Sequence, residues 1–144
     1  FLGSTDPIEF AARYAGAKAV ADDKGVPIRA LPTHLSPEHA ADEIAAHLAS
    51  DMAGIDGIFA ASDMLAIACM TELQKRGIDV PGGMKLVGFD DLPIASQTRP
   101  ALTTIRQDIA AGAARLADLL LRRMGGENTA SVVLPPDLVG RQTA

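Results

Sequence analysis

The chain has 144 residues, of which 48% are hydrophobic and 22% are charged. This balance is typical of one folded domain with a buried core. The formal net charge is −5, whereas a free-standing nucleic-acid-binding domain usually carries a basic face. The only adjacent basic pair, Arg122 and Arg123, follows a run of leucines and is expected to be a solvated helix end.

Cysteine content and hydropathy further limit the kind of protein that the chain can be. Cys69 is the single cysteine, so no intrachain disulfide can form, and its apolar helical surroundings indicate a small core or interface residue. No apolar run approaches the ~20 residues of a membrane span, and no signal-peptide pattern is found. These features fit a cytoplasmic location.

Residues 1–60 alternate predicted helices with short apolar strands. Asp6-Pro7 with Glu9 is typical of a capped helix start, and Gly25 is the expected left-handed stop of that helix. Ser36-Pro37 starts a second helix in the same way. The predicted elements are, in order, a strand end at 1–3 whose beginning looks missing, a helix at 6–24, a strand at 28–31, a helix from 36 to about 52–54, and a strand at 57–60.

Residues 61–144 continue this alternation and then become irregular. Ser62 is the expected N-cap of the third helix, Asp63 lies in its first turn, where negative charge is favoured, and Gly77 stops it. The remaining predicted elements are a strand at 85–89, an irregular loop at 92–100, an extended segment at 102–105, a long helix at 108–124, and short strands at 132–134 and 138–141.

The predicted fold class is α/β, with a parallel sheet flanked by helices. Strands that alternate with helices and read as continuous apolar runs are typical of βαβ units. In such sheets, ligands bind just outside the carboxyl ends of the strands. Asp90, which directly follows the strand residues of the run Met84–Asp91, is therefore a candidate acceptor for a hydroxylated ligand.

Several motifs, in this order and spacing, resemble the ligand-sensing domain of the LacI/GalR family of bacterial transcription regulators. Each motif is weak alone, and their joint order carries the resemblance. The motifs are Arg13-Tyr-Ala-Gly16, Phe59-Ala-Ala-Ser-Asp63, Arg76–Pro81, Val87-Gly-Phe-Asp-Asp91, Leu102–Gln107, and Leu134–Val139 with Arg141.

The resemblance implies a type I periplasmic-binding-protein-like domain, of which this chain is a truncated C-terminal lobe. Family members have an N-terminal helix-turn-helix and two α/β lobes, with the effector bound in the cleft between them. Residues 1–103 would belong to the C-terminal lobe, and residues 104–126 would cross to the N-terminal lobe, whereas residues 127–144 would return.

The crossing helix has a physical consequence. Its apolar stripe, formed by Ile109, Ala113, Leu116, Leu120 and Met124, would pack on the other lobe. Without that lobe, the stripe favours association. We therefore expect oligomerisation, swapping, or a non-native resting place for residues 108–124, and a detached, fully solvated helix in a monomer would count against this.

The resemblance also assigns effector contacts. Arg13 would bind ligand hydroxyls or carboxylates with its fixed donors, unless it is a surface arginine paired with Glu9 or Asp6. Asp90 would accept two sugar hydroxyls with Arg13 holding it, unless it caps the following turn. Further candidates are Ser62, which competes with its own capping role, Gln107 after the crossover, and Leu35, which stands where several relatives place a stacking aromatic ring.

The resemblance implies that the chain dimerises through this lobe, and the matching surface is the third predicted helix together with the Leu92–Thr98 loop and the second predicted helix. Two of its apolar residues, Ile67 and Met70, could equally belong to the core. The candidate dimer-interface residues are Ala66, Ile67, Met70, Gln74 and Ile94.

No residue pattern indicates catalysis, a metal or a cofactor. His39 and His47 lie ~12 Å apart along one helix, too far to share zinc, and Ser62 lacks the flanking glycines of a nucleophile elbow. The function that the resemblance implies is effector sensing and dimerisation within a sugar-responsive regulator that binds operator DNA through a separate helix-turn-helix. A periplasmic sugar-binding protein is the alternative, and an enzyme on an α/β scaffold is a third hypothesis.

Overall fold

A sheet with the order β1-β2-β3-β4 organises the chain, and the computed structural model describes residues 1–4, 8–34, 37–50 and 52–144. Strands β1 (Gly57–Phe59), β2 (Lys85–Phe89) and β3 (Thr103–Arg106) are parallel. Strand β4 (Asp137–Val139) pairs antiparallel with β3. Leu2 extends the other edge through parallel bridges to Ala60 and Leu31. The expected mostly parallel α/β sheet is therefore confirmed.

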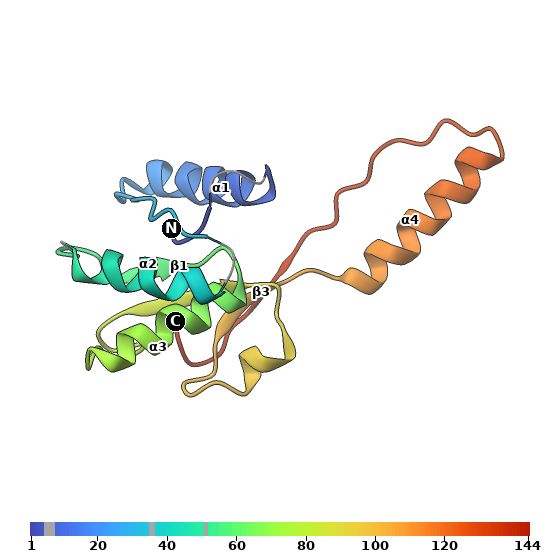
Figure 1. Ribbon diagram of the computed structural model, residues 1–144. Helices are drawn as coiled ribbons and strands as arrows, with labels where there is room; N and C mark the ends of the chain where they lie inside the picture. The colour runs from blue at the N-terminus through green and yellow to red at the C-terminus, as the bar shows by residue number, and fades with distance from the viewer. Residues whose placement is uncertain (5–7, 35–36, 51) are drawn as a thin grey trace.

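Three helices cover the sheet: α1 (Ile8–Lys24), α2 (Pro37–Ala49) and α3 (Asp63–Lys75) (Figure 1). Helix α3 packs on both α2 and β2. Side chains alternate along β2, so that Leu86 and Gly88 are buried while Val87 and Phe89 are half-buried. The largest fully buried side chains of the core include Leu2, Ile44, Leu65, Leu73, Leu86 and Leu102.

Most predicted elements match the structure. Helix α1 ends at Lys24 before Gly25 with φ +66°, α3 is followed by Gly77 with φ +70°, and β2 has the predicted bounds. The predicted caps Asp6 and Ser36 lie outside the described residues, as does Leu35.

Three predicted elements were wrong in extent. Helix α2 ends at Ala49, earlier than expected. The strand at 28–31 is reduced to a bridge at Leu31, because its only sheet neighbour in the described chain is Leu2. Residues 132–134 form no strand, since only Asp137–Val139 lies beside β3.

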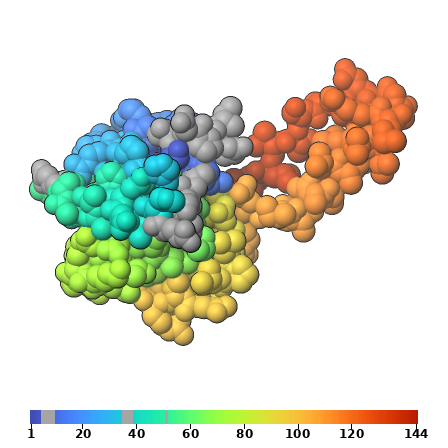
Figure 2. Space-filling view, viewed as in Figure 1, coloured from blue at the N-terminus to red at the C-terminus, as the bar shows by residue number. Residues whose placement is uncertain are grey.

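Helix α4 (Ile109–Met124) projects from the body, and an extended segment returns from its end to β4 (Figures 1 and 2). Asp108 caps it, with Oδ1 accepting a 2.8 Å hydrogen bond from the backbone N–H of Ala111. No residue of α4 is buried, and Ile109, Leu116 and Met124 are 70–76% exposed. In this single chain, α4 therefore has no new resting place on the described body, whereas oligomerisation and swapping stay predictions.

Candidate functional site

The carboxyl ends of β1 and β2 bring Arg13 of α1 beside Asp90. Arg13 Nη1 donates a 2.5 Å hydrogen bond to the carbonyl of Ala61, which follows β1. Its guanidinium carbon lies 3.8 Å from the ring centroid of Phe89 and 4.9 Å from that of Phe10. Stacking against both rings fixes the plane of the guanidinium. The site is therefore built from three segments that are far apart in sequence.

Arg13 and Asp90 face each other without a direct hydrogen bond. Arg13 Nη2 lies 3.8 Å from Asp90 Oδ1, which is within ion-pair range but beyond hydrogen-bond length. Within the described chain, the Asp90 carboxylate accepts no hydrogen bond. The two side chains are 18% and 33% exposed, so both can reach a ligand. This arrangement offers an anionic acceptor next to cationic donors.

The environment of Asp90 favours its neutral form more than water does. Burial raises the pKa of the Asp90 carboxyl, and the charge of Asp63 acts in the same direction, while Arg13 lowers it. A hydrogen-bond donor from a ligand would offset this burial, because it stabilises the ionised form. The ionised Asp90 carboxylate is thus more stable when it accepts hydrogen bonds from ligand hydroxyls than when it has no hydrogen-bond partner.

The backbone that presents Asp90 is strained. Asp90 has φ +112° and Asp91 has φ +54°, in the half of conformational space that costs a non-glycine residue about 1–3 kcal/mol. The Asp90 N–H donates a 2.8 Å hydrogen bond to the carbonyl of Ile105 on β3. Asp90 does not cap the following turn, because the Leu92 N–H of that turn donates its hydrogen bond to the carboxylate of Asp63 instead.

Asp63 supports this turn, a role that local sequence patterns did not predict. Its side chain is fully buried, with Oδ2 accepting a 2.7 Å hydrogen bond from the Leu92 N–H and Oδ1 accepting a 2.5 Å hydrogen bond from the Thr104 hydroxyl. Burial raises the pKa of Asp63, and these hydrogen bonds act against that rise. Asp63 therefore joins the start of α3 to the chain after β2 and to β3.

The other effector candidates are placed as follows. Ser62 caps α3, with its Oγ accepting a 3.3 Å hydrogen bond from the Leu65 N–H, which leaves its own hydroxyl hydrogen for another acceptor. Gln107 is exposed and follows β3 at the same edge of the sheet as Asp90. Leu35 is not among the described residues.

The predicted dimer-interface residues divide into two groups. Ala66 and Met70 are buried within the chain, because α3 turns them toward the core. Ile67 is half-buried, Ile94 is 45% exposed, and exposed Gln74 donates a 2.8 Å hydrogen bond to the carbonyl of Arg99. Only this second group could contact a second copy directly.

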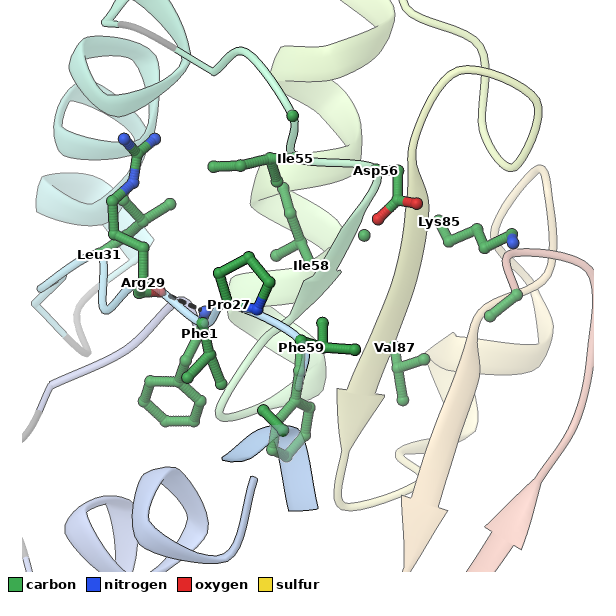
Figure 3. A pocket seen from close by; sticks show the side chains of 16 residues that line it. Phe1, Pro27, Arg29, Leu31, Ile55, Asp56, Ile58, Phe59, Lys85 and Val87 are labelled. Carbon is green, nitrogen blue, oxygen red and sulfur yellow. Dashed lines mark hydrogen bonds between the residues drawn. The ribbon is translucent and has the colours of Figure 1, made fainter. Parts of the chain in front are cut away.

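A pocket of about 540 Å³ lies away from Arg13 and Asp90, beside the amino ends of β1 and β2 (Figure 3). Apolar side chains line it, including Ile55, Phe59 and Val87. Asp56, just before β1, and Lys85, the first residue of β2, lie at its rim. Because parallel sheets bind ligands at the opposite ends of their strands, this pocket is not the predicted site.

The histidines take part in local contacts. A ring nitrogen of His34 bonds Glu43, and His47 Nε2 lies 2.7 Å from the Pro32 carbonyl. Among the described residues, no group of three or more His, Cys, Asp or Glu side chains could hold a metal, and no helix is long and apolar enough to cross a membrane. Burial raises the pKa of the Cys69 thiol to about 12, which makes it a poor nucleophile.

The sequence profile of the periplasmic binding protein-like domain family matches residues 2–144. The HTH-type transcriptional regulator DegA of Bacillus subtilis is 33% identical over 136 residues, which cover 91% of this chain and 40% of DegA. The HTH-type transcriptional regulator GalS of Salmonella typhimurium is 37% identical over 91 residues, which cover 62% of this chain and 27% of GalS. The chain thus spans less than half the length of these relatives.

Solved structures agree with the sequence relatives. A LacI family regulator from Enterococcus faecium with bound ribose superposes with a TM-score of 0.85 at 28% identity, covering 99% of this chain and 54% of that one. The lac repressor dimer bound to operator and the anti-inducer ONPF gives a TM-score of 0.90 at 24% identity, which supports the fold. The chain belongs to the periplasmic binding protein-like domain family, and its relatives there are LacI-family transcriptional regulators whose effector-binding domain it matches in part.

Proposed function

We propose that the chain is the ligand-sensing and dimerisation part of a LacI/GalR-type regulator, and that it binds a small hydroxylated effector, a sugar or sugar derivative. The observation that carries the proposal is the pair formed by Arg13 and Asp90. Its 3.8 Å separation leaves donors and an acceptor open at the carboxyl edge of the sheet. Vicinal hydroxyls can accept from the guanidinium and donate to the carboxylate at the same time. Ser62 and Gln107 would add contacts, and Leu35 would line the site.

In this proposal, residues 1–103 form the C-terminal lobe, 104–126 cross to a second lobe, and 127–144 return. Effector binding would close the cleft between lobes and change the operator affinity of a distant DNA-binding head by linkage. Ile67, Gln74 and Ile94 would contact a second copy, with Ala66 and Met70 packed beneath them. The protein would act in the cytoplasm without a cofactor and without catalysis. The named relatives are transcriptional regulators, which favours this function over that of a transport receptor.

A titration with matched variants tests the site. D-ribose and cellobiose are suitable probes, because regulators that are 28% and 26% identical to this chain have been solved with them. For a probe that the unmodified chain binds, we expect Asp90→Asn and Arg13→Gln each to raise the Kd about tenfold or more. This is the loss expected for a charged hydrogen-bonding group. Asp56→Asn is the control, since exposed Asp56 precedes β1 at the opposite edge of the sheet.

In a regulator that contains this chain, Arg13→Ala and Asp90→Ala should abolish the response to effector while operator binding persists. An unchanged response in both variants would remove these residues from the site. Turnover of a probe that is lost in Asp90→Ala would instead favour an enzyme.

A further inference from the structure

The carboxylate of Asp91 lies between Arg106 at the end of β3 and Arg141 in the segment that follows β4. Asp91 Oδ2 accepts a 2.6 Å hydrogen bond from Nε of Arg106, the last residue of β3. Asp91 Oδ1 accepts a 2.5 Å hydrogen bond from Nη2 of Arg141, which follows β4. The Asp91 side chain is only 8% exposed. One buried carboxylate therefore bonds the strand that leads to α4 and the segment that follows the returning strand β4.

These two strands are the attachment of the arm, which we define as residues 107–136. The arm leaves the body directly after Arg106 and returns just before β4. Arg141 is itself tied to β3, since its N–H donates to the Thr103 hydroxyl at 2.9 Å and its Nη1 donates to the Leu102 carbonyl at 2.7 Å. Because no residue of α4 is buried, the arm is held at its two ends, by the pairing of β3 with β4 and by this junction.

The same junction borders the ligand-facing turn. Asp90 precedes Asp91, and both residues have positive φ values. The backbone preference of an L-residue does not favour such values. The turn is held by bonds to its neighbours: the N–H of Asp90 bonds β3, and the N–H of Leu92 bonds Asp63. The side chain of Asp91 is the part of this turn that bonds the arginines of β3 and of the segment after β4.

We propose that Asp91 is a positioning residue that couples the turn presenting Asp90 to the direction of the arm. A shift of the arm would move Arg106 and Arg141, and their bonds to Asp91 would transmit that shift to Asp90. Conversely, a ligand that orders Asp90 would order the junction. The second half of this proposal depends on the proposed effector site, whereas the first half concerns the chain alone.

Electrostatics is consistent with a strong junction. Burial by itself raises the pKa of Asp91, but the hydrogen bonds and charges of Arg141 and Arg106 outweigh it and hold that pKa below its usual range. Charge-assisted bonds of this kind are short and directional. Asparagine in place of Asp91 would keep the shape, but its NH2 group would face an arginine donor.

The test perturbs the arm side and measures the turn. Backbone and arginine Nε–H signals are followed by NMR and hydrogen exchange in the 144-residue chain, in Arg106→Gln, in Asp91→Asn and in the double variant. Arg115→Gln is the control, because Arg115 lies on α4 and pairs only with Asp118 among the described residues. No ligand is needed for this measurement.

We expect Arg106→Gln to speed exchange of the Asp90 and Leu92 N–H groups about fivefold, in the range of a half-exposed ion pair, although Arg106 bonds neither group. Asp91→Asn should also shift the Arg106 Nε–H signal, and the double variant should exchange no faster than Asp91→Asn. Amides of α3 should not change. Exchange at Asp90 and Leu92 that stays as in the unmodified chain, or a uniform rise that includes α3, would overturn the coupling.

The ligand half is read in the same samples. In the unmodified chain, a sugar (D-ribose or cellobiose) that shifts the Asp90 amide signal should also shift the Arg106 Nε–H signal. In Asp91→Asn, the same sugar should leave the Arg106 Nε–H signal unchanged. If neither sugar shifts the Asp90 amide, the proposed sugar effector is rejected, while the exchange data still decide whether Asp91 couples the turn to the arm.

Discussion

The Thr104 hydroxyl donates a 2.5 Å hydrogen bond to Oδ1 of the buried Asp63 carboxylate, and so joins β3 to the N-terminus of α3 across 41 positions of sequence. Both residues are fully buried. The bond offsets part of the cost of burying the carboxylate, since an ionised acceptor away from water needs its donors. The turn that carries Asp90 rests on this pair, because the other oxygen of Asp63 accepts from the Leu92 N–H.

Thr104→Val should destabilise the protein by about 1–3 kcal/mol, because it leaves a buried carboxylate oxygen without its donor while the volume hardly changes. Urea unfolding at neutral pH measures the loss. Thr71→Val is the matched control: Thr71 is exposed, its hydroxyl bonds the Ile67 carbonyl within α3, and its replacement should cost less than about 0.5 kcal/mol. Equal losses of unfolding free energy in the two variants would mean that the buried hydrogen bond contributes no more to stability than an exposed one.

A second prediction concerns the glycine that makes room for Asp63. A Cβ on Gly88 would collide with Asp63 Oδ1 and would lie 3.1 Å from Leu102 Cδ2. Gly88→Ala should therefore cost about 1–3 kcal/mol or more through overpacking. Gly57→Ala is the control on the neighbouring strand, where the added Cβ meets Lys85 at an ordinary 3.9 Å and should change stability by less than about 1 kcal/mol. Thermal unfolding of the two variants would show whether the Gly88 space is needed.

Sequence patterns predicted the elements better than their long-range contacts. Helix stops at Gly25 and Gly77 and the bounds of β2 follow from local chemistry, namely a left-handed glycine or an apolar run. Strand β4 has only three residues and its antiparallel direction depends on the path of the arm, which local periodicity does not record.

The site shows the same division. The family motifs pointed to Arg13 and Asp90, and the fold brings them to one edge, where their ligand role remains a proposal. Asp63 was expected only to favour the helix dipole. Its partners Leu92 and Thr104 lie 29 and 41 positions away, so only the folded chain reveals that it supports the Asp90 turn.

The two neighbouring aspartates should respond to neutralisation with opposite signs. The pKa of Asp91 is lowered in the folded chain, so its stabilisation is present above the pKa of an unfolded aspartate and is lost as pH falls through the folded value. The pKa of Asp90 is raised, chiefly by burial, so its ionisation costs stability as pH rises through that value. At pH 7, Asp91→Asn should therefore destabilise the chain and Asp90→Asn should stabilise it.

Urea midpoints at pH 7 and at about pH 3, below the usual aspartate pKa, check this pair. Both differences from the unmodified chain should shrink at the acid pH. The carboxyl of Asp90, whose pKa is raised, is protonated there, and the stabilisation by Asp91 decreases once the aspartate of the unfolded chain binds a proton. Destabilisation by Asp90→Asn at pH 7 would show that the native Asp90 carboxylate has a stabilising partner, contrary to its raised pKa.

The last prediction compares two leucines on helices of similar length. Leu65 on α3 is 1% exposed, whereas Leu116 on α4 is 70% exposed. Leu65→Ala should cost about 2–5 kcal/mol, as for a core leucine, and Leu116→Ala should cost less than about 0.5 kcal/mol at low protein concentration. Amides of α4 should also exchange faster than those of α3, because a helix of this length without packing is marginally stable in water. A cost for Leu116→Ala that grows with protein concentration would instead show that the apolar stripe of α4 is buried against a second copy, since only binding makes stability depend on concentration.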